Sequence, residues 1–162
     1  MAFTINIKKK EYNIKFNYRL LFKANKKLGT KDENGNSQND GAGILFTQVL
    51  EQEDDALVNI IQLVSGATEN EALEAIENYI ANSGLEDEEE AYGKIFEDLK
   101  EEMLNSGFFM KKVKKYIENL EKAVSILQAK KDEEAKQQAE AVMKLLEKMK
   151  KEILLSTAQE EA

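Results

Sequence analysis

The segment FTINIKKKEYNIKFN, residues 3–17, decides how the chain begins to fold. Apolar and polar residues alternate in it with a period of two, which is typical of β-strands with one buried face. Two such runs in succession predict an antiparallel β-hairpin with its turn at residues 9–11, although no Asn-Gly or Gly-Gly pair is present there. The predicted buried face consists of Phe3, Ile5, Ile7, Tyr12, Ile14 and Phe16.

After the hairpin the period changes to that of an α-helix. Asn17 is a candidate N-cap of a first helix, and Gly29 is a candidate for the position just beyond its C-terminal end. Residues 29–43 are polar, and we expect them to form a long loop. From Ile44 onward the apolar residues recur every three or four positions. A two-stranded hairpin is only marginally stable alone in water, so we expect it to pack on these helices or to pair with another chain.

The last two predicted helices each carry a heptad-like apolar seam. Steps of four and three residues separate the apolar side chains of residues 113–127, and again those of residues 135–153, but in a different phase. We therefore predict an α+β, mainly α fold. Its parts are an N-terminal β-hairpin packed on a helical domain at residues 1–128 and a C-terminal amphipathic helix at residues 129–162. The final STAQEEA is expected to be a frayed tail.

The composition excludes several classes of chemistry. The chain of 162 residues contains no Cys, His, Pro or Trp, so it has no thiolate, no imidazole and no zinc site of the usual kind. The acidic residues at positions 54–55 and 87–90 lie where helix N-termini favour negative charge, which indicates capping rather than catalysis. The segment that starts at Asp32 begins like a calcium loop, but Gly43 replaces the bidentate Glu that such a loop needs. We therefore expect no catalytic residue, no metal and no cofactor.

Charge and hydropathy indicate where the protein acts. The N-terminus has no apolar core of a signal peptide, and no apolar run approaches the roughly 18 residues of a membrane helix. We therefore expect a cytoplasmic protein without a membrane partner. The net charge of −8 is uneven, with +7 on residues 1–30, −17 on residues 31–110 and +2 on residues 111–162. Opposite charges could attract copies of the chain, although solvated helix faces would leave the same pattern.

The seam of the last helix is the best candidate for contact with another protein. It is narrow and has Lys and Glu on both sides, which favours coiled-coil-like pairing. The alternative is a terminal helix folded back on the core. The Lys-rich segment 111–115 forms the polar side of one helix in an acidic chain, so we expect no nucleic-acid partner. Two adjacent Phe residues are second candidates, with a place in the core as the favoured alternative. The candidate partner contacts are Val142, Leu146, Met149, Ile153, Phe108 and Phe109.

The order of these elements resembles a known family. A hairpin reading INIKKKEYNIKFN is followed by a helix with LFKANKKLG, by further helices, and by NSGFFMKKVKKYIENLEKA. Over about residues 2–126 this order resembles the tail assembly chaperones of long-tailed phages and prophages, chiefly those of Gram-positive bacteria. The chain departs from the family at Lys9, where the turn of the hairpin often contains Gly.

The resemblance implies a non-enzymatic role in virion assembly. Such chaperones bind the tape measure protein, which is long, helical and prone to aggregate before the tail tube covers it. They recruit tail tube protein subunits, some self-associate, and they leave before the virion is finished. The free edge or basic flank of the hairpin is then a candidate contact with a neighbouring copy. The alternative function is a small cytoplasmic regulatory or adaptor protein that binds another protein or DNA.

Overall fold

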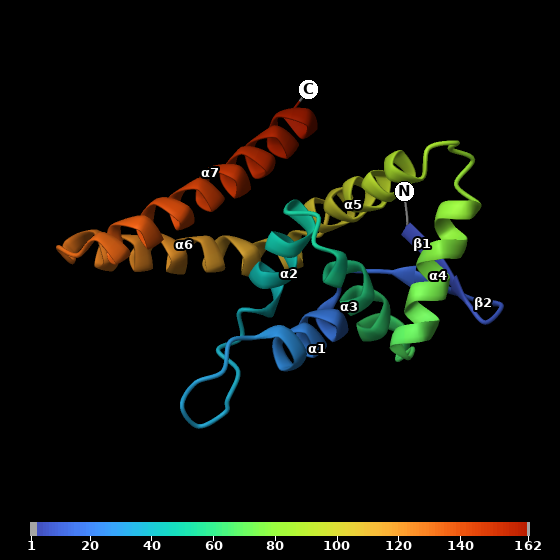
Figure 1. Ribbon diagram of the computed structural model, residues 1–162, viewed down its shortest axis with the longest axis horizontal. Helices are drawn as coiled ribbons and strands as arrows, with labels where there is room; N and C mark the ends of the chain where they lie inside the picture. The colour runs from blue at the N-terminus through green and yellow to red at the C-terminus, as the bar shows by residue number, and fades with distance from the viewer. Residues whose placement is uncertain (1–2, 162) are drawn as a thin grey trace.

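The computed structural model describes residues 3–161, and it describes side chains as far as residue 156. Within that part of the chain, a two-stranded antiparallel sheet precedes seven helices, which confirms the predicted α+β, mainly α fold (Figure 1). None of the described helices is both long and apolar enough to span a bilayer. The elements are β1 (Phe3–Ile7), β2 (Lys10–Ile14), α1 (Tyr18–Leu28), α2 (Gly41–Leu50), α3 (Asp54–Ser65), α4 (Glu69–Ala81), α5 (Glu88–Leu104), α6 (Gly107–Ala129) and α7 (Glu133–Glu161).

The hairpin has the predicted buried face but a different turn. Ile5 pairs with Tyr12, and the predicted apolar residues all lie in the core or pack against it. The turn consists of Lys8 and Lys9, whose φ angles are 50° and 68°. Two left-handed residues in succession form the turn that suits the twist of a hairpin. The predicted turn at residues 9–11 is therefore wrong, because Lys residues occupy a conformation that Gly or Asn usually provides.

The core joins every element of the fold. α3 and α4 pack on the hairpin, α5 also contacts β1, and α2 lies between α1 and α6 (Figure 1). Buried side chains from β1 through α7 form one hydrophobic cluster. The predicted boundary at residue 128 falls at the end of α6, and the division of the chain into two units there stays a prediction. The predicted frayed tail is helical as far as Glu161, and Ala162 lies outside the described residues.

The polar segment after α1 is shorter than predicted. α2 begins at Gly41, whereas the sequence predicts a loop through Gly43. Gly41 lies against the backbone of Ala24, and Gly43 lies against the ring of Tyr116 on α6. Close packing of two helices on these glycines therefore extends α2 backward into the predicted loop.

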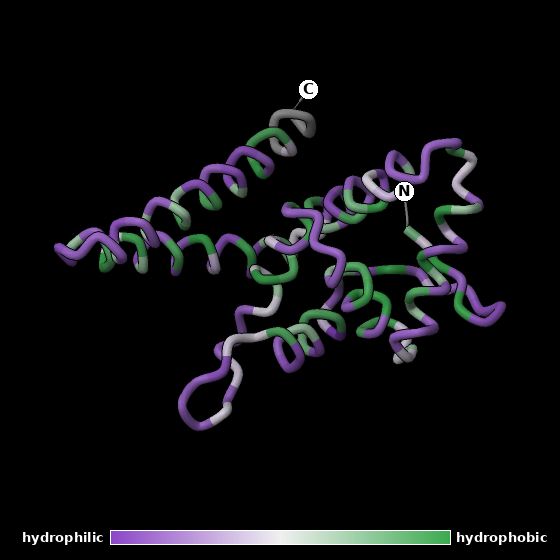
Figure 2. Tube along the Cα trace, viewed as in Figure 1, coloured by the Kyte–Doolittle hydropathy of each residue, from purple (hydrophilic) through white to green (hydrophobic). Residues whose placement is uncertain are grey.

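The remaining loop, residues 29–40, is hydrophilic (Figure 2) and organised by its own side chains. Asp40 accepts hydrogen bonds from the backbone N–H and the hydroxyl of Thr30, at 2.7 and 2.6 Å. Asp32 accepts backbone N–H bonds from Asn34 and Asn36, both at 2.9 Å. The segment that looked like a calcium loop is thus a turn in which Asp32 binds backbone donors. Among the described residues, no three acidic groups are placed to hold a metal ion.

Candidate functional site

The two heptad-like seams pair with each other inside the chain. α6 and α7 lie side by side and run in opposite directions (Figure 1). All six residues of the predicted seam at residues 135–153 are buried or half-buried, together with the neighbouring Leu145, Glu152 and Ser156, and α6 is the main element that packs against α7. Of the two alternatives for the last helix, this structure has the helix folded back on the core.

Ion pairs along the rim align α7 with its neighbours. Lys150 pairs with Glu121 of α6 at 3.1 Å, and Lys100 of α5 pairs with Glu152 at 3.1 Å. Burial acts to lower the pKa of Lys100, but its hydrogen bonds to Glu97 and Glu152 outweigh burial and raise the pKa. An exposed pair such as Lys150–Glu121 contributes about 0–1 kcal/mol. The ion pairs therefore set the alignment of α7, while apolar burial holds it.

The four candidate contact residues of α7 differ in accessibility. Leu146 and Met149 are buried, and the Met149 sulfur lies 3.9 Å from the hydroxyl of Thr47 on α2, which donates to it. Val142 and Ile153 are half-buried and pack against the core. A partner can therefore reach Val142 and Ile153 in part, whereas Leu146 and Met149 are covered by α6 and α2. Their role in partner contact stays a prediction.

Phe108 and Phe109 are adjacent but lie on different faces of α6, one exposed and one buried. Phe109 is fully buried, and its ring centroid is 5.1 Å from that of Phe16. Phe108 is 46% exposed, and its ring centroid is 6.0 Å from that of Tyr18. The alternative that both side chains lie in the core is therefore correct for Phe109 and wrong for Phe108. A role in partner contact stays a prediction for both.

Two adjoining grooves flank the last turns of α7. One, of about 320 Å³, lies between Ile153 and the corner where α5 meets α6, with Leu104 and Met110 in its walls. The other, of about 580 Å³, has Leu155 in its wall. Leu154 and Leu155 are both exposed, and neither is among the contact residues predicted from the sequence. The apolar run ILL at residues 153–155 could have indicated them. A narrow seam accounts for only one of three successive apolar residues, so the other two lie outside it.

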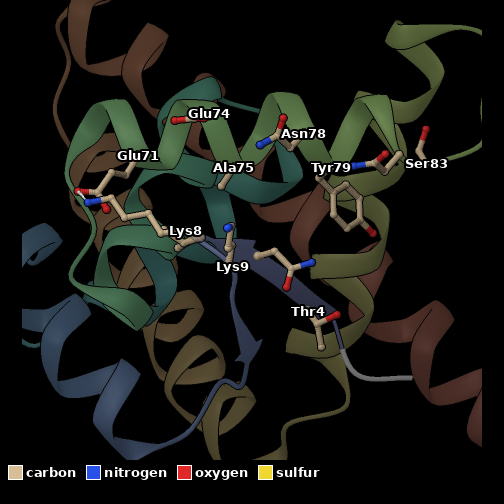
Figure 3. Close-up of a pocket in the computed structure, with 12 residues that line it drawn as sticks. Thr4, Lys8, Lys9, Glu71, Glu74, Ala75, Asn78, Tyr79 and Ser83 are labelled. Atoms are coloured by element: carbon tan, nitrogen blue, oxygen red, sulfur yellow. Dashed lines mark ion pairs between the residues drawn. The ribbon is translucent and has the colours of Figure 1, made fainter.

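A further groove of about 640 Å³ lies between the polar face of β1 and α4 (Figure 3). Lys8 at the hairpin turn pairs with Glu71 across it at 3.6 Å, and the amide side chains of Asn6, Asn78 and Asn82 complete the wall. Tyr79 borders the groove, and burial, followed by the charge of Asp98, raises the pKa of its phenol. Small-molecule pockets are mostly apolar with few polar groups, so this lining suits polar surface contacts better than an enclosed ligand.

A separate hydrogen bond joins α5 to the start of α3. The hydroxyl of Tyr92 donates to the carboxylate of Asp54, one of the acidic residues assigned to helix capping. Burial, then this hydrogen bond and the negative charge of Asp54, raise the pKa of Tyr92. Asp54 therefore has two structural roles. It accepts the hydrogen bond of the Tyr92 phenol, and it places a favourable negative charge in the first turn of α3.

A comparison with protein families identifies one match. The family model described as "Phage tail assembly chaperone protein, TAC" matches residues 4–118. This range begins in β1, ends in the middle of α6 and stops short of α7. No curated protein and no solved structure matches the chain.

Proposed function

The chain belongs to the phage tail assembly chaperone family, and we propose that it binds the tape measure protein of a long-tailed phage and helps to recruit tail tube subunits. The match over residues 4–118 carries this proposal, and it agrees with the resemblance of the hairpin and of the GFF-containing helix. The proposal includes self-association and a place of action in the cytoplasm of a Gram-positive host. It also includes absence from the finished virion.

The surface of the α6–α7 hairpin supports a role in binding a long helical client. Large apolar side chains are exposed on both helices, at Ile126, Met143, Leu154 and Leu155. An amphipathic client helix can pack its own apolar face on such side chains, which requires neither a catalytic pocket nor a cofactor.

Two of the predicted contact residues of α7 are buried, which implies that α7 separates from α6 when the client binds. Leu146 and Met149 are covered in this structure, so they can contact a client only after α7 moves. Exposing these two side chains alone costs about 3–6 kcal/mol, and the facing apolar side chains of α6 lose their cover as well. A client helix with a similar seam would bury the same side chains again and offset that cost. We include this exchange in the proposed function because the seam of α7 is narrow and two of its buried residues are Ala135 and Ala139. Small side chains bury little apolar area, so they contribute little to holding α7 on α6.

A covalent lock between the two helices tests the exchange. The chain contains no Cys, and Glu121 and Lys150 are in contact, so Glu121→Cys/Lys150→Cys can be joined by a short bismaleimide. We expect the locked protein to lose co-purification with the tape measure protein, whereas the same variant without the reagent keeps it. The matched control is Glu140→Cys/Lys144→Cys, two exposed positions one turn apart on α7, where the same reagent leaves α7 free to move.

The outcomes separate the exchange from the function. Equal client binding by the locked and unlocked proteins would disprove the separation of α7 from α6. The client would then contact only residues that are accessible while the two helices are paired. If the unmodified chain, co-expressed with the tape measure protein, fails to co-purify with it, the proposed function itself is wrong.

A further inference from the structure

Three aromatic side chains form an exposed cluster that the fold does not need. Tyr18 is 66% exposed, Phe22 is 48% exposed and Phe108 is 46% exposed. The ring of Tyr18 lies between the other two, with centroid distances of 6.4 Å to Phe22 and 6.0 Å to Phe108. We call these three residues the aromatic patch. Aromatic side chains are enriched at the centres of protein interfaces and often dominate their binding energy.

The patch is held in place by buried contacts beneath it. The hydroxyl of Ser106 accepts the N–H of Phe109 at the start of α6 and donates to the backbone carbonyl of Phe16 at 2.8 Å. The Phe16 and Phe109 rings pack together in the core. These contacts join the N-terminal ends of α1 and α6, which carry the patch on their outer sides. The two helix ends that carry the patch are therefore held together before any partner binds, which lowers the entropic cost of docking.

The two segments of the chain that carry the patch are basic. Residues 12–31 and 103–117, which contain the patch, carry ten Lys and Arg and no Asp or Glu. The ammonium of Lys26 lies 4.8 Å from the centre of the Phe22 ring, and Arg19, Lys111 and Lys112 are exposed on the same two helices. A partner for this surface should present apolar side chains with acidic groups beside them.

The chain itself has a surface of that description on α4. Residues 51–102 carry seventeen acids and two Lys, and α4 contains four Glu and no basic residue. Leu73 is 42% exposed. The half-buried Ile76 and Ile80 follow it on the same side of the helix, and the exposed Glu69 and Glu77 lie one turn before and after it. We call this face the acidic ridge.

The patch and the ridge of one molecule do not meet. α4 packs on β1, α3 and α5, whereas α1 packs on α2, α3 and α6. α3 therefore separates the two surfaces (Figure 1). We propose that the aromatic patch of one copy docks on the acidic ridge of a second copy. The two surfaces differ, so the contact is head-to-tail and adds copies in an open chain or a ring.

This inference rests on the self-association included in the proposed function, and it does not depend on the tape measure protein. A second copy is favoured over nucleic acid because the matching ridge combines acidic groups with an exposed leucine. The chain also has a net charge of −8, which repels a polyanion outside the patch.

Analytical ultracentrifugation of the full chain over a concentration series tests the contact. We expect the average mass to rise with concentration, and less so when NaCl is raised from about 50 to about 500 mM, because salt screens the charges. Tyr18→Ser should weaken association by about tenfold or more. Lys111→Glu/Lys112→Glu alone and Glu69→Lys/Glu77→Lys alone should each abolish it. Mixing these two charge-reversed variants should restore it, because each then offers the surface that the other needs.

A matched control changes charge equally at a distance from both surfaces. Lys136→Glu/Lys144→Glu alters two exposed positions of α7 and should leave association unchanged, with the same circular dichroism spectrum as the other variants. An unchanged association of the patch variants, or a wild-type chain that stays monomeric at low salt, overturns the proposal.

Two further measurements identify the alternative occupants. If the patch variants lose co-purification with the tape measure protein but still self-associate, the patch binds the client and the inference is wrong. If they lose binding to a fluorescent DNA oligonucleotide and still self-associate, the patch binds nucleic acid and the inference is equally wrong. Loss of self-association with retained client binding supports the inference and leaves the proposed function standing.

Discussion

Replacement of Gly41 by Ala tests the close contact between α1 and α2 directly. A Cβ atom at Gly41 would lie 2.5 Å from the carbonyl carbon and oxygen of Ala24 and 2.6 Å from the nitrogen of Asn25. Carbon atoms in contact are normally about 3.5–4.0 Å apart, and the atoms involved here belong to the backbone. The two helices would therefore have to separate by about 1 Å.

The expected cost follows from known effects of overpacking. Extra methyl groups in a tightly packed interior destabilise proteins by about 1–3 kcal/mol. Gly41 is the first residue of α2, so the helix propensity of Ala returns little of this cost. For a chain of this length, a change of 1 kcal/mol shifts the melting temperature by about 2–4 °C. We expect Gly41→Ala to lower the melting temperature by about 2–12 °C.

Gly93→Ala is the matched control. Gly93 lies inside α5, and no atom outside its own helix lies within 4 Å of the position that a Cβ would take. Ala is more favourable than Gly in a helix by about 0.5–1 kcal/mol, so this variant should melt about 1–4 °C higher. Thermal unfolding followed by circular dichroism measures both. The reasoning fails if Gly41→Ala is as stable as the wild type, or if Gly93→Ala loses as much stability as Gly41→Ala.

Three other predictions address the cap of α6, the seam of α7 and the tyrosine on α5. Ser106→Ala should lower the unfolding free energy by about 1–2 kcal/mol in urea titrations, because it removes an N-cap and the bond to the carbonyl of Phe16. Met149→Ala should cost about 2–5 kcal/mol and speed amide exchange in α7, whereas the exposed Met143→Ala should change stability by less than about 0.5 kcal/mol. Stability should fall as pH rises above about 10, because burial and a carboxylate partner raise the folded-state pKa of Tyr92, so the unfolded chain releases the phenolic proton first. Tyr92→Phe should reduce that alkaline loss in urea titrations between about pH 8 and pH 11.

Local features of the fold were predictable from the sequence. The alternation of residues 3–17 predicted the buried face of the hairpin, and the predicted N-cap Asn17 accepts the backbone N–H of Leu20 in the first turn of α1. These features depend on a period or on a side chain three residues from its partner. The necessary information therefore lies within one short segment.

Non-local contacts account for two of the errors, those at Gly43 and at Phe108. The sequence predicts a loop through Gly43, but contact with Tyr116, more than seventy residues away, places Gly43 inside a helix. The two residues Lys8 and Lys9 take a left-handed turn because the paired strands on either side fix their spacing. The adjacent Phe108 and Phe109 look equivalent in the sequence, and only the docking of α6 on Phe16 buries the second of them.

The sequence by itself determined that residues 135–153 form a helix with one narrow apolar face that must be covered in water. It also determined the separation of basic and acidic segments along the chain. Only the tertiary structure decided that the seam of α6 covers this face, and that Tyr18, Phe22 and Phe108 gather into one exposed cluster. The physical reason is that the hydrophobic effect favours the burial of an apolar face but does not specify which surface covers it. The covering surface depends on which elements the connections of the chain bring close to that face.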